Sequence, residues 1–332
     1  MTTPTIEWIE GEVRLIDQTL LPHEEKVLAI TDPHEMVEAI RCLAVRGAPA
    51  IGVAGAYGVA LAASRYGSDT GDFAEAVQAL REARPTAVNL ARMVDRTAAF
   101  ADQGFERILT EAHAIRAEEL QASVSMGELG ADLVLEFTGG RPARAMTICN
   151  TGGLATIARG TALAVVQTLH ERGSLVEALP LETRPLLQGG RLTTWELARM
   201  GAPHRLLVDS AGPFLLSQSA ADVVVIGADR VAANGDTANK IGSFSLALGA
   251  SHAGVPFIVV APESTIDMET PTGAAIEIED RGPEEVTGFN GVPVSPPGTR
   301  ALNPAFDVTP VELITALVTE KRVVRFDREE KL

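Results

Sequence analysis

The spacing of hydrophobic residues changes near residue 138, and this change divides the chain into two regions. Before that point, apolar residues recur roughly every three to four positions, the spacing of helices that bury one face. Five helices are predicted, over residues 33–43, 48–63, 72–82, 87–101 and 107–135. A short strand or hairpin over residues 12–17 and 26–31 precedes them. Residues 1–138 are therefore predicted to form a mainly helical domain with a short β element.

After the turn-rich cluster Thr138–Pro142, short runs of Val, Ile and Leu alternate with helical spacing. Strands are predicted over residues 145–149, 176–182, 205–209, 222–229 and 257–261. Helices are predicted over residues 154–169, 193–200, 213–218, 241–253 and 310–320. Residues 270–302, rich in Pro, Gly and Glu, predict a long irregular excursion. Because strands alternate with helices, residues 139–332 are predicted to form an α/β domain with a mostly parallel sheet covered on both faces.

The composition is that of an ordinary globular protein, with 46% hydrophobic and 22% charged residues among 332. Only 4% is aromatic, so Ala, Val and Leu must fill most of the core. The formal net charge of −16 argues against nucleic acid and anionic membranes as partners, because both attract clustered Lys and Arg. A phosphorylated metabolite is compatible with this charge, provided that a few basic side chains converge.

The two cysteines, Cys42 and Cys149, lie far apart in sequence and show no metal-type spacing. Reduced thiols in a cytoplasmic protein are therefore expected. The N-terminal segment has early acidic residues and no apolar stretch, so we do not expect a signal peptide. The uncharged run Ala48–Ala63 is shorter than the roughly 20 residues of a membrane-spanning helix, and is predicted to be a tightly packed buried helix.

Polar or reactive residues follow four of the predicted strands. They are Cys149–Gly153, Glu182–Pro185, Asp209–Ser210 and Gly227–Arg230. Parallel sheets bind ligands at the carboxyl ends of their strands, so a site is predicted at this edge. Gly152 and Gly153 would leave backbone N–H groups free for an anion at the start of the next helix, although such glycines are also ordinary turn residues. Neither a GxGxxG nor a GxxxxGK[ST] motif occurs, which argues against nucleotide ligands.

Cys149 and Asp229 are the candidate reactive residues at this edge. Cys149 ends a strand before a predicted helix N-terminus, which favours the thiolate, although a free Cys is often only a small buried hydrophobe. Asp229 follows the apolar run Val223–Gly227, where partial desolvation would raise its pKa and suit acid–base catalysis. The alternative for Asp229 is a helix or turn cap.

Three basic residues are candidates for binding an anion. Lys240 is one of only four lysines among 28 basic residues, and it opens a predicted apolar helix whose N-terminus adds positive potential. Arg46 and Arg84 stand at helix junctions, in Arg46-Gly47-Ala48-Pro49 and Arg84-Pro85-Thr86, where an Arg can clamp a phosphate. The alternative for each is a solvated surface side chain.

Taken together, the motifs resemble the methylthioribose-1-phosphate isomerase family, which is related to the regulatory subunits of the translation-initiation guanine-nucleotide exchange factor. The matching stretches span nearly the whole chain: RGAPAIG at 46–52, ARPTAVN at 83–89, CNTG at 149–152, ETRPLLQG at 182–189, GADRVAANGDTANKIG at 227–242, APESTID at 261–267 and NPAFDVTP at 303–310.

The resemblance implies a helical N-terminal domain, a Rossmann-like C-terminal domain, a homodimer, no metal or nucleotide cofactor and a role in methionine salvage. It implies that Cys149 and Asp229 form the catalytic pair. It also implies a substrate-binding set made up of Arg46, Gly47, Ala48, Arg84, Gln188, Asn239 and Lys240.

The chain departs from the family pattern at three places. Ile148 stands where many members have His, Leu181 where many have Asp, and Ser210-Ala211-Gly212-Pro213 replaces Asn-Met-Ala-Ala. The last change resembles ribose-1,5-bisphosphate isomerases, and some family members act on 5-deoxyribose 1-phosphate. Two alternatives to the methylthioribose activity therefore stay open: an isomerase of another pentose phosphate, and a non-catalytic regulatory protein.

Overall fold

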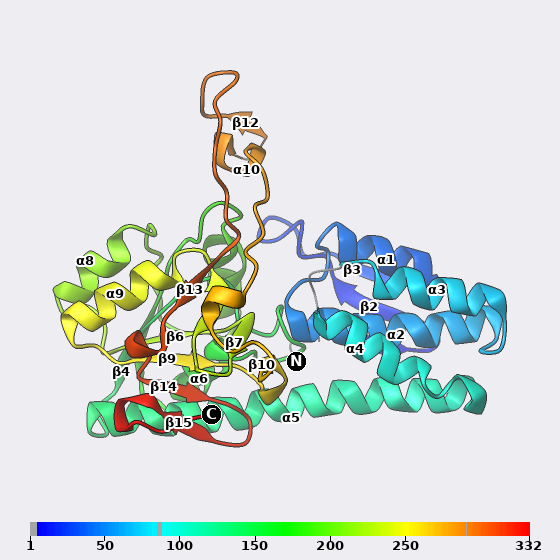
Figure 1. The fold of residues 1–332 in the computed structure, drawn as a ribbon, viewed down its shortest axis with the longest axis horizontal. Coiled ribbons are helices and arrows are strands. Elements are labelled where there is room, and N and C mark those ends of the chain that lie inside the picture. The colour runs from blue at the N-terminus through cyan, green and yellow to red at the C-terminus, as the bar shows by residue number, and fades with distance from the viewer. Residues whose placement is uncertain (1–4, 85–87, 290) are drawn as a thin grey trace. The chain divides into compact units, whose positions relative to one another are not determined.

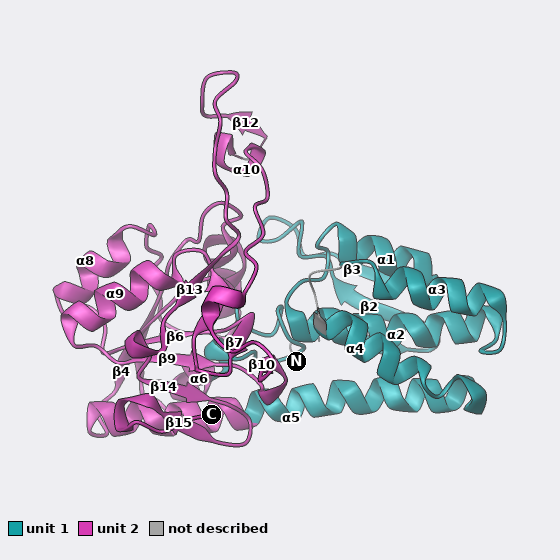
Figure 2. Cartoon of the chain, in the orientation of Figure 1, with its two compact units in different colours: residues 1–124, 151–164 teal, residues 125–150, 165–332 magenta. Residues whose placement is uncertain are grey.

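The structure is a computed structural model and describes residues 5–84, 88–289 and 291–332 (Figure 1). The chain forms two compact units (Figure 2). Unit 1 comprises residues 1–124 and 151–164, and unit 2 comprises residues 125–150 and 165–332. These bounds differ from those of the predicted domains, because the long helix α5 (Phe105–Thr138) contributes to both units. The domain boundary between residues 138 and 139 stays a prediction.

Unit 1 combines a small antiparallel sheet with helices. Its three strands are β1 (Ile6–Ile9), β2 (Glu12–Ile16) and β3 (Val27–Ile30), paired in that order. Helices α1 (Pro33–Arg41), α2 (Ala48–Tyr66), α3 (Gly71–Arg81) and α4 (Val88–Ala98) follow, before the N-terminal part of α5. All five predicted helices and both predicted strand segments are confirmed, and β1 is an additional strand.

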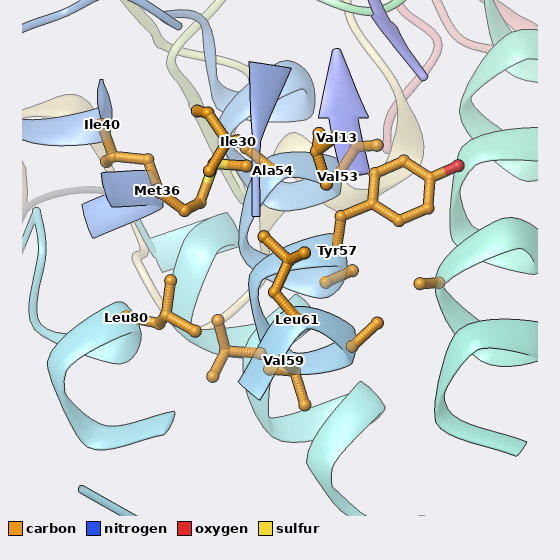
Figure 3. Close-up of a cluster of buried hydrophobic side chains, with 14 of the residues drawn as sticks. Val13, Ile30, Met36, Ile40, Val53, Ala54, Tyr57, Val59, Leu61 and Leu80 are labelled. Carbon is orange, nitrogen blue, oxygen red and sulfur yellow. The ribbon is translucent and has the colours of Figure 1, made fainter. Parts of the chain in front are cut away.

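Helix α2 is the buried centre of unit 1, as its composition predicted. Every residue from Ala50 to Ala63 is buried. A Cβ on Gly55 would lie 2.6 Å from Leu90 Cδ1, and a Cβ on Gly58 would lie 2.6 Å from Leu80 Cδ2, so these glycines let α4 and α3 approach closely. Figure 3 shows Tyr57 and its aliphatic neighbours in this core. None of the helices within the described residues is both long and apolar enough for a membrane span.

Unit 2 is built on a six-stranded sheet with the order β15-β14-β9-β6-β4-β5. Its strands are β4 (Ala143–Thr147), β5 (Leu175–Pro180), β6 (Val223–Ile226), β9 (Phe257–Val260), β14 (Ala316–Val318) and β15 (Val323–Arg325). All neighbours are parallel except β14 and β15. Helices α8 (Ala211–Ser217) and α9 (Ser243–Ala253) lie on one side, and α6 (Ala162–Glu171) with the end of α5 lies on the other (Figure 1). The predicted α/β class with a mostly parallel, Rossmann-like sheet is confirmed.

A second, four-stranded sheet in unit 2 was not predicted. Its order is β10-β7-β8-β13, with β7 (Arg230–Ala232), β8 (Thr237–Lys240), β10 (Ile266–Asp267) and β13 (Phe306–Thr309). The excursion predicted over residues 270–302 is irregular in most places but includes the short helix α10 (Glu284–Thr287) and the hairpin strands β11 (Gly288–Phe289) and β12 (Val292–Pro293). This part stands away from the larger sheet (Figure 1).

Three of the helices and strands predicted for residues 139–332 are wrong. The helix over 310–320 is instead a short turn followed by β14, because three buried apolar residues, Ala316 to Val318, pair with β9. The helix over 154–169 begins only at Ala162, after a series of turns. Residues 205–209 form no regular strand: Leu207 makes an isolated bridge to Leu181, and the preceding His204 makes one to Ala178. Helix α7 (Thr194–Arg199) lies close to the position predicted for it, residues 193–200.

Candidate active site

Cys149 and Asp229 follow β4 and β6, two adjacent central strands of the larger sheet. The connections between strands change direction at this point of the sheet. Strand β4 comes first, β5 lies on one side of it, and β6, β9 and β14 lie on the other. The connections therefore leave β4 in opposite directions, and in open α/β sheets ligands bind in the crevice outside the carboxyl ends of such strands, here β4 and β6. Cys149 follows β4 and Asp229 follows β6. The structure thus brings the two candidates to the ligand-binding position of this fold class.

Cys149 is buried, 8% exposed, and has a left-handed backbone with φ of 66°. Its N–H donates to Thr183 Oγ1 over 2.9 Å, and its carbonyl accepts from Thr193 Oγ1 over 2.6 Å. The next residue, Asn150, donates through Nδ2 to Glu196 Oε1 over 2.7 Å. Because all these partners are themselves buried, the turn carrying the thiol is fixed on both sides.

Asp229 is held in a different way. Its N–H donates to the carbonyl of Ala238 over 2.9 Å, where β8 pairs antiparallel with β7. The Asp229 residue is exposed, so the expected desolvation of its carboxylate is wrong for this structure. The apolar run before it is buried as predicted, but burial ends at Gly227.

Lys240 lies at the end of β8, and the prediction that it opens a helix is wrong. All four residues of β8 are buried, and α9 begins only at Ser243. Lys240 Nζ donates to the carbonyl of Ala305 over 2.8 Å and lies 4.6 Å from the centroid of the Phe306 ring. The buried ammonium is thus held by backbone and ring contacts from the neighbouring strand β13, which places it more firmly than a solvated lysine.

The N-terminus of α9 is already occupied by a carboxylate. Asp307 accepts from the N–H of Gly242 over 2.7 Å and from the N–H of Phe244 over 3.1 Å. Burial raises the pKa of Asp307 to about 6, against the opposing effects of these two N–H donors and of Lys240. The positive potential that we expected a substrate anion to use at this helix is therefore used by Asp307.

Asn239 and Gln188, the other two predicted binding residues of unit 2, are both buried and 3% exposed. Asn239 donates through Nδ2 to Ser243 Oγ over 2.8 Å. Gln188 directly precedes a π-helical turn, Gly189–Thr193, and its buried Oε1 has no hydrogen-bond partner. A buried amide oxygen without a partner is unfavourable, and π-turns are frequent at functional sites, so both features support a binding role.

The loop that carries Thr183 and Arg184 is fastened to Asp209. The N–H of Thr183 donates to Asp209 Oδ1 and that of Arg184 to Asp209 Oδ2, each over 2.7 Å. Thr183 and Leu187 have φ of 68° and 54°, so this loop carries left-handed residues beside the left-handed Cys149. Such conformations in residues with side chains cluster where the surrounding structure enforces them, and often at functional sites.

The other predicted binding residues, Arg46, Gly47, Ala48 and Arg84, lie in unit 1. Gly47 has φ of 92°, and a Cβ there would lie 2.2 Å from the Ala155 carbonyl oxygen, so only glycine fits. Gly47 caps the start of α2 without a side-chain hydrogen bond. Arg46 and Arg84 are both partly exposed. Pro85 and Thr86 of the second predicted junction lie outside the described residues.

Gly152 and Gly153, which were predicted to bind an anion at the start of a helix, do not lie at a helix N-terminus. Residues 152–159 form turns, and the Leu163 N–H at the start of α6 donates to Thr151 Oγ1 over 3.2 Å. A Cβ on Gly153 would lie 2.0 Å from the Ala158 carbonyl oxygen. This glycine therefore has a packing role, and the alternative of an ordinary turn residue is the better interpretation.

A pocket of about 520 Å³ lies in unit 2 between residues 184–191 and the β11–β12 hairpin. None of the predicted catalytic or binding residues lines it. Arg184 and Pro185, from the loop after β5, line this pocket, whereas Cys149 and Asp229 do not. Within the described part of the chain, no group of three His, Cys, Asp or Glu side chains could hold a metal ion.

Sequence reasoning missed the residues that hold the candidates in place: Thr183, Thr193, Asp209, Glu196 and Asp307. Thr183 and Asp307 lie inside the quoted motifs, and Asp209 was noted as a strand end. Their positions within or near the motifs were the only sequence feature that pointed to these residues. Which backbone groups their side chains bind depends on contacts between segments that are distant in sequence.

Residues 44–325 match the initiation factor 2 subunit family. The chain is 47% identical over 340 residues to a methylthioribose-1-phosphate isomerase of Chloroflexus aurantiacus, covering 98% of this chain and 96% of that protein. It is 48% identical over 324 residues to a probable bifunctional methylthioribose-1-phosphate isomerase/methylthioribulose-1-phosphate dehydratase of Nocardia farcinica. That match covers 96% of this chain but spans only 59% of the length of the Nocardia protein.

Two solved structures are similar over almost the whole chain. One is 5-methylthioribose 1-phosphate isomerase from Pyrococcus horikoshii OT3, with a TM-score of 0.92 and 40% identity, covering 98% of this chain and 93% of that one. The other is translation initiation factor eIF-2B, subunit delta, from A. fulgidus, with a TM-score of 0.86 and 38% identity, covering 99% of this chain and 97% of that one.

Proposed function

This chain belongs to the initiation factor 2 subunit family, and we propose that it is an aldose–ketose isomerase that converts 5-methylthioribose 1-phosphate to 5-methylthioribulose 1-phosphate in methionine salvage. The observation that carries the proposal is the 47% identity to an isomerase of that name over 98% of this chain. The positions of Cys149 and Asp229, after neighbouring strands of one sheet, support it.

In the proposed reaction, Asp229 and Cys149 act as acid and base. The phosphate on C1 blocks spontaneous ring opening, so protonated Asp229 donates its proton to the ring oxygen as the bond from C1 to that oxygen breaks. Cys149 thiolate removes the C2 proton, and the electron pair forms a C1=C2 double bond. Cys149 then returns the proton to C1, and Asp229 accepts the proton of the C2 hydroxyl, which becomes the ketone. Both groups return to their starting states.

A hydride shift from C2 to C1 is the competing route, in which Cys149 only stabilises the site. Turnover in heavy water separates the two. Deuterium at C1 of the product would establish proton transfer through solvent-exchangeable groups.

We propose that the substrate phosphate is bound by the basic and polar set of Arg46, Gly47, Ala48, Arg84, Gln188, Asn239 and Lys240. The buried position of Lys240 and the unpartnered Oε1 of Gln188 support their part in it. We also propose a homodimer, to be tested by analytical ultracentrifugation, and a cytoplasmic location, which the free thiols of Cys42 and Cys149 favour.

Three residues at which this chain departs from the family pattern, Ile148, Leu181 and Gly212, are buried in unit 2. Ile148 and Leu181 are buried in one apolar cluster with Leu246. A Cβ on Gly212 would lie 3.1 Å from both Leu181 Cδ2 and Leu246 Cδ1. Ile148, Leu181 and Gly212 therefore pack in the core of unit 2, whereas Ser210 is exposed.

The test of the activity uses two substitutions and four substrates. Cys149→Ser and Asp229→Asn should each reduce turnover of 5-methylthioribose 1-phosphate by at least about 1000-fold, as expected for groups that exchange protons with the substrate. Unchanged turnover in both variants would refute the enzyme assignment. Values of kcat/KM for 5-methylthioribose 1-phosphate, 5-deoxyribose 1-phosphate, ribose 1-phosphate and ribose 1,5-bisphosphate would identify the sugar.

A regulatory function is the second candidate, because the A. fulgidus protein named as an initiation factor subunit is 38% identical over 99% of this chain. The presence of Cys149 and Asp229 at the strand ends favours the enzyme. Lack of turnover with all four sugar phosphates would favour the regulatory alternative.

A further inference from the structure

The backbone of Cys149 is held in an unfavourable conformation by two threonine side chains. A left-handed φ brings the Cβ of an ordinary residue close to the following carbonyl oxygen, and such a conformation persists only where neighbours enforce it. At Cys149 the enforcing contacts are Thr183 Oγ1 on the N–H and Thr193 Oγ1 on the carbonyl. We call Thr183 and Thr193 the hydroxyl clamp.

Each hydroxyl of the clamp both donates and accepts a hydrogen bond, so its orientation is defined. Thr183 accepts from the Cys149 N–H and donates to the carbonyl of Leu181 over 2.9 Å. Thr193 donates to the Cys149 carbonyl and accepts from Asn150 Nδ2 over 3.3 Å. Thr183 is 0% and Thr193 1% exposed, so water does not substitute for a missing hydroxyl.

Each clamp residue is itself positioned by its own element. The Asp209 carboxylate fixes Thr183 through the N–H groups of Thr183 and Arg184. Thr193 ends the π-helical turn Gly189–Thr193. A π-turn contains one more residue per turn than an α-helix, and the extra residue alters which side chain faces Cys149. The π-turn therefore places the Thr193 hydroxyl where it bonds the carbonyl of the left-handed Cys149.

We propose that Thr183 and Thr193 are positioning residues that keep the Cys149 thiol aimed into the crevice between the ends of β4 and β6. This inference rests on the proposed function of Cys149 as the acid–base group. If either hydroxyl is removed, the Cys149 backbone relaxes toward negative φ, the Cα–Cβ bond swings, and the sulfur leaves the position from which it reaches C2 of the sugar. Substrate binding, which uses other residues, is preserved.

The first experiment compares three variants in steady-state kinetics. Thr193→Val keeps the shape of the side chain and removes the hydroxyl, and it should lower kcat about 100-fold while KM stays within about threefold. Thr193→Ser keeps the donor and the acceptor and should stay within about threefold of the wild-type kcat. Thr194→Val is the matched control, because the adjacent Thr194 hydroxyl donates to the carbonyl of Gly190 in the preceding π-turn and not to Cys149.

The second experiment measures the thiol directly and does not depend on turnover. In a Cys42→Ser background, which removes the exposed thiol, the rate of Cys149 alkylation by iodoacetamide is followed from pH 6 to 10. Thr193→Val should change the limiting alkylation rate at least about fivefold, because the sulfur no longer occupies its fixed environment. Thr193→Ser and Thr194→Val should reproduce the parent profile.

The two experiments distinguish failure of the proposed function from failure of the hydroxyl clamp. If the wild type does not turn over any sugar phosphate, the proposed function fails while the alkylation profiles still test the clamp. Wild-type kcat and alkylation in Thr193→Val would overturn the clamp, and so would equal loss in Thr193→Ser and Thr193→Val. If Thr193→Val does not fold, Thr183→Val provides the same test. Failure of both to fold beside a folded Thr194→Val would show that the hydroxyls serve folding alone, which also overturns the proposal.

Discussion

The turns after β4 and β6 carry the two proposed catalytic residues, yet different kinds of contacts hold them. After β4, the backbone of Cys149 is fixed by the side chains of Thr183 and Thr193. After β6, the N–H of Asp229 bonds the carbonyl of Ala238, and a small sheet continues directly from it. Backbone contacts survive most substitutions, whereas side-chain contacts do not. The position of Cys149 is therefore sensitive to single changes around it, and that of Asp229 is comparatively robust.

The two turns differ in solvent exposure as well. Cys149 is 8% exposed and belongs to a network of buried hydroxyl, amide and carboxyl groups. Asp229 is exposed. A thiolate base benefits from a fixed direction, because its proton must come from carbon, whereas a carboxyl group that exchanges protons with oxygen tolerates some freedom. The contrast leads to four predictions, in order of decreasing effect.

The largest effect is expected at Asp209, which supports the Cys149 side. Asp209→Ala leaves the N–H groups of Thr183 and Arg184 without their acceptor and loosens the hydroxyl clamp. We expect kcat/KM to fall about 50-fold and the free energy of unfolding to fall by about 2 kcal/mol. Steady-state kinetics and urea denaturation provide the measurements. Asp209→Asn, which retains one acceptor oxygen, should give intermediate values, and wild-type kinetics in Asp209→Ala would contradict the prediction.

A smaller effect, on stability only, is expected at Asp236 in the turn between β7 and β8. Its carboxylate accepts from the N–H groups of Gly273 and Val311. Asp236→Ala should lower the free energy of unfolding by about 1–2 kcal/mol and leave kcat within about threefold of the wild type, because the backbone ladder still holds Asp229. A large loss of kcat in a folded Asp236→Ala protein would show that Asp229 is as sensitive as Cys149.

The stability effect of Asp236 should depend on pH. Burial opposes ionisation, but hydrogen bonds from Asn234 and from the two N–H groups outweigh it and lower the pKa of Asp236 below 3.8. A lowered pKa stabilises the folded state above the ordinary carboxyl range and loses this contribution as pH falls. The difference in unfolding free energy between wild type and Asp236→Ala should therefore shrink below about pH 4.

The smallest effect is expected at Asp307, which caps α9 beside Lys240. The folded-state pKa of about 6 lies above the ordinary value of 3.8, so folding takes up a proton between these pH values. Stability contributed by the protonated group is complete at low pH and lost as pH rises through 6. We expect wild type to lose about 1 kcal/mol relative to Asp307→Asn between pH 4 and 7, measured by urea denaturation. Parallel curves for the two proteins would contradict this.

The sequence predicted the helices of unit 1 because their signals are local. The apolar spacing of α1 and α3 and the Ala- and Gly-rich run of α2 each lie within one element. The alternation of apolar runs with helices also placed Cys149 and Asp229 at strand ends on one edge of the sheet. What failed depends on partners distant in sequence. β8 is a strand because Asn239 pairs with Asp307, and this pairing overrides the helical spacing that begins near Lys240.

The supports of the site were hidden for the same reason. Thr193 meets Cys149 across 44 positions of sequence, and Asp209 meets Thr183 across 26. Burial of Asp229 was predicted from the apolar run before it, but exposure of a residue just after a strand depends on what covers that edge. Candidate catalytic residues can thus be predicted from motifs and from their position after strands. The residues that surround them can be identified only once the three-dimensional structure is known.

The place of β14 in the sheet has a consequence for how the protein is made. β14 pairs with β9 and is the second-last strand along the chain, although it lies inside the strand order. During synthesis, β4, β5, β6 and β9 emerge from the ribosome while β9 is still an uncovered edge with unpaired N–H and C=O groups. The nascent sheet can therefore add a strand from another chain until the last strands arrive. Chaperone capture would shield this edge, whereas slow translation over residues 261–318 would prolong its exposure, so the yield of soluble protein should depend on how fast this stretch is synthesised.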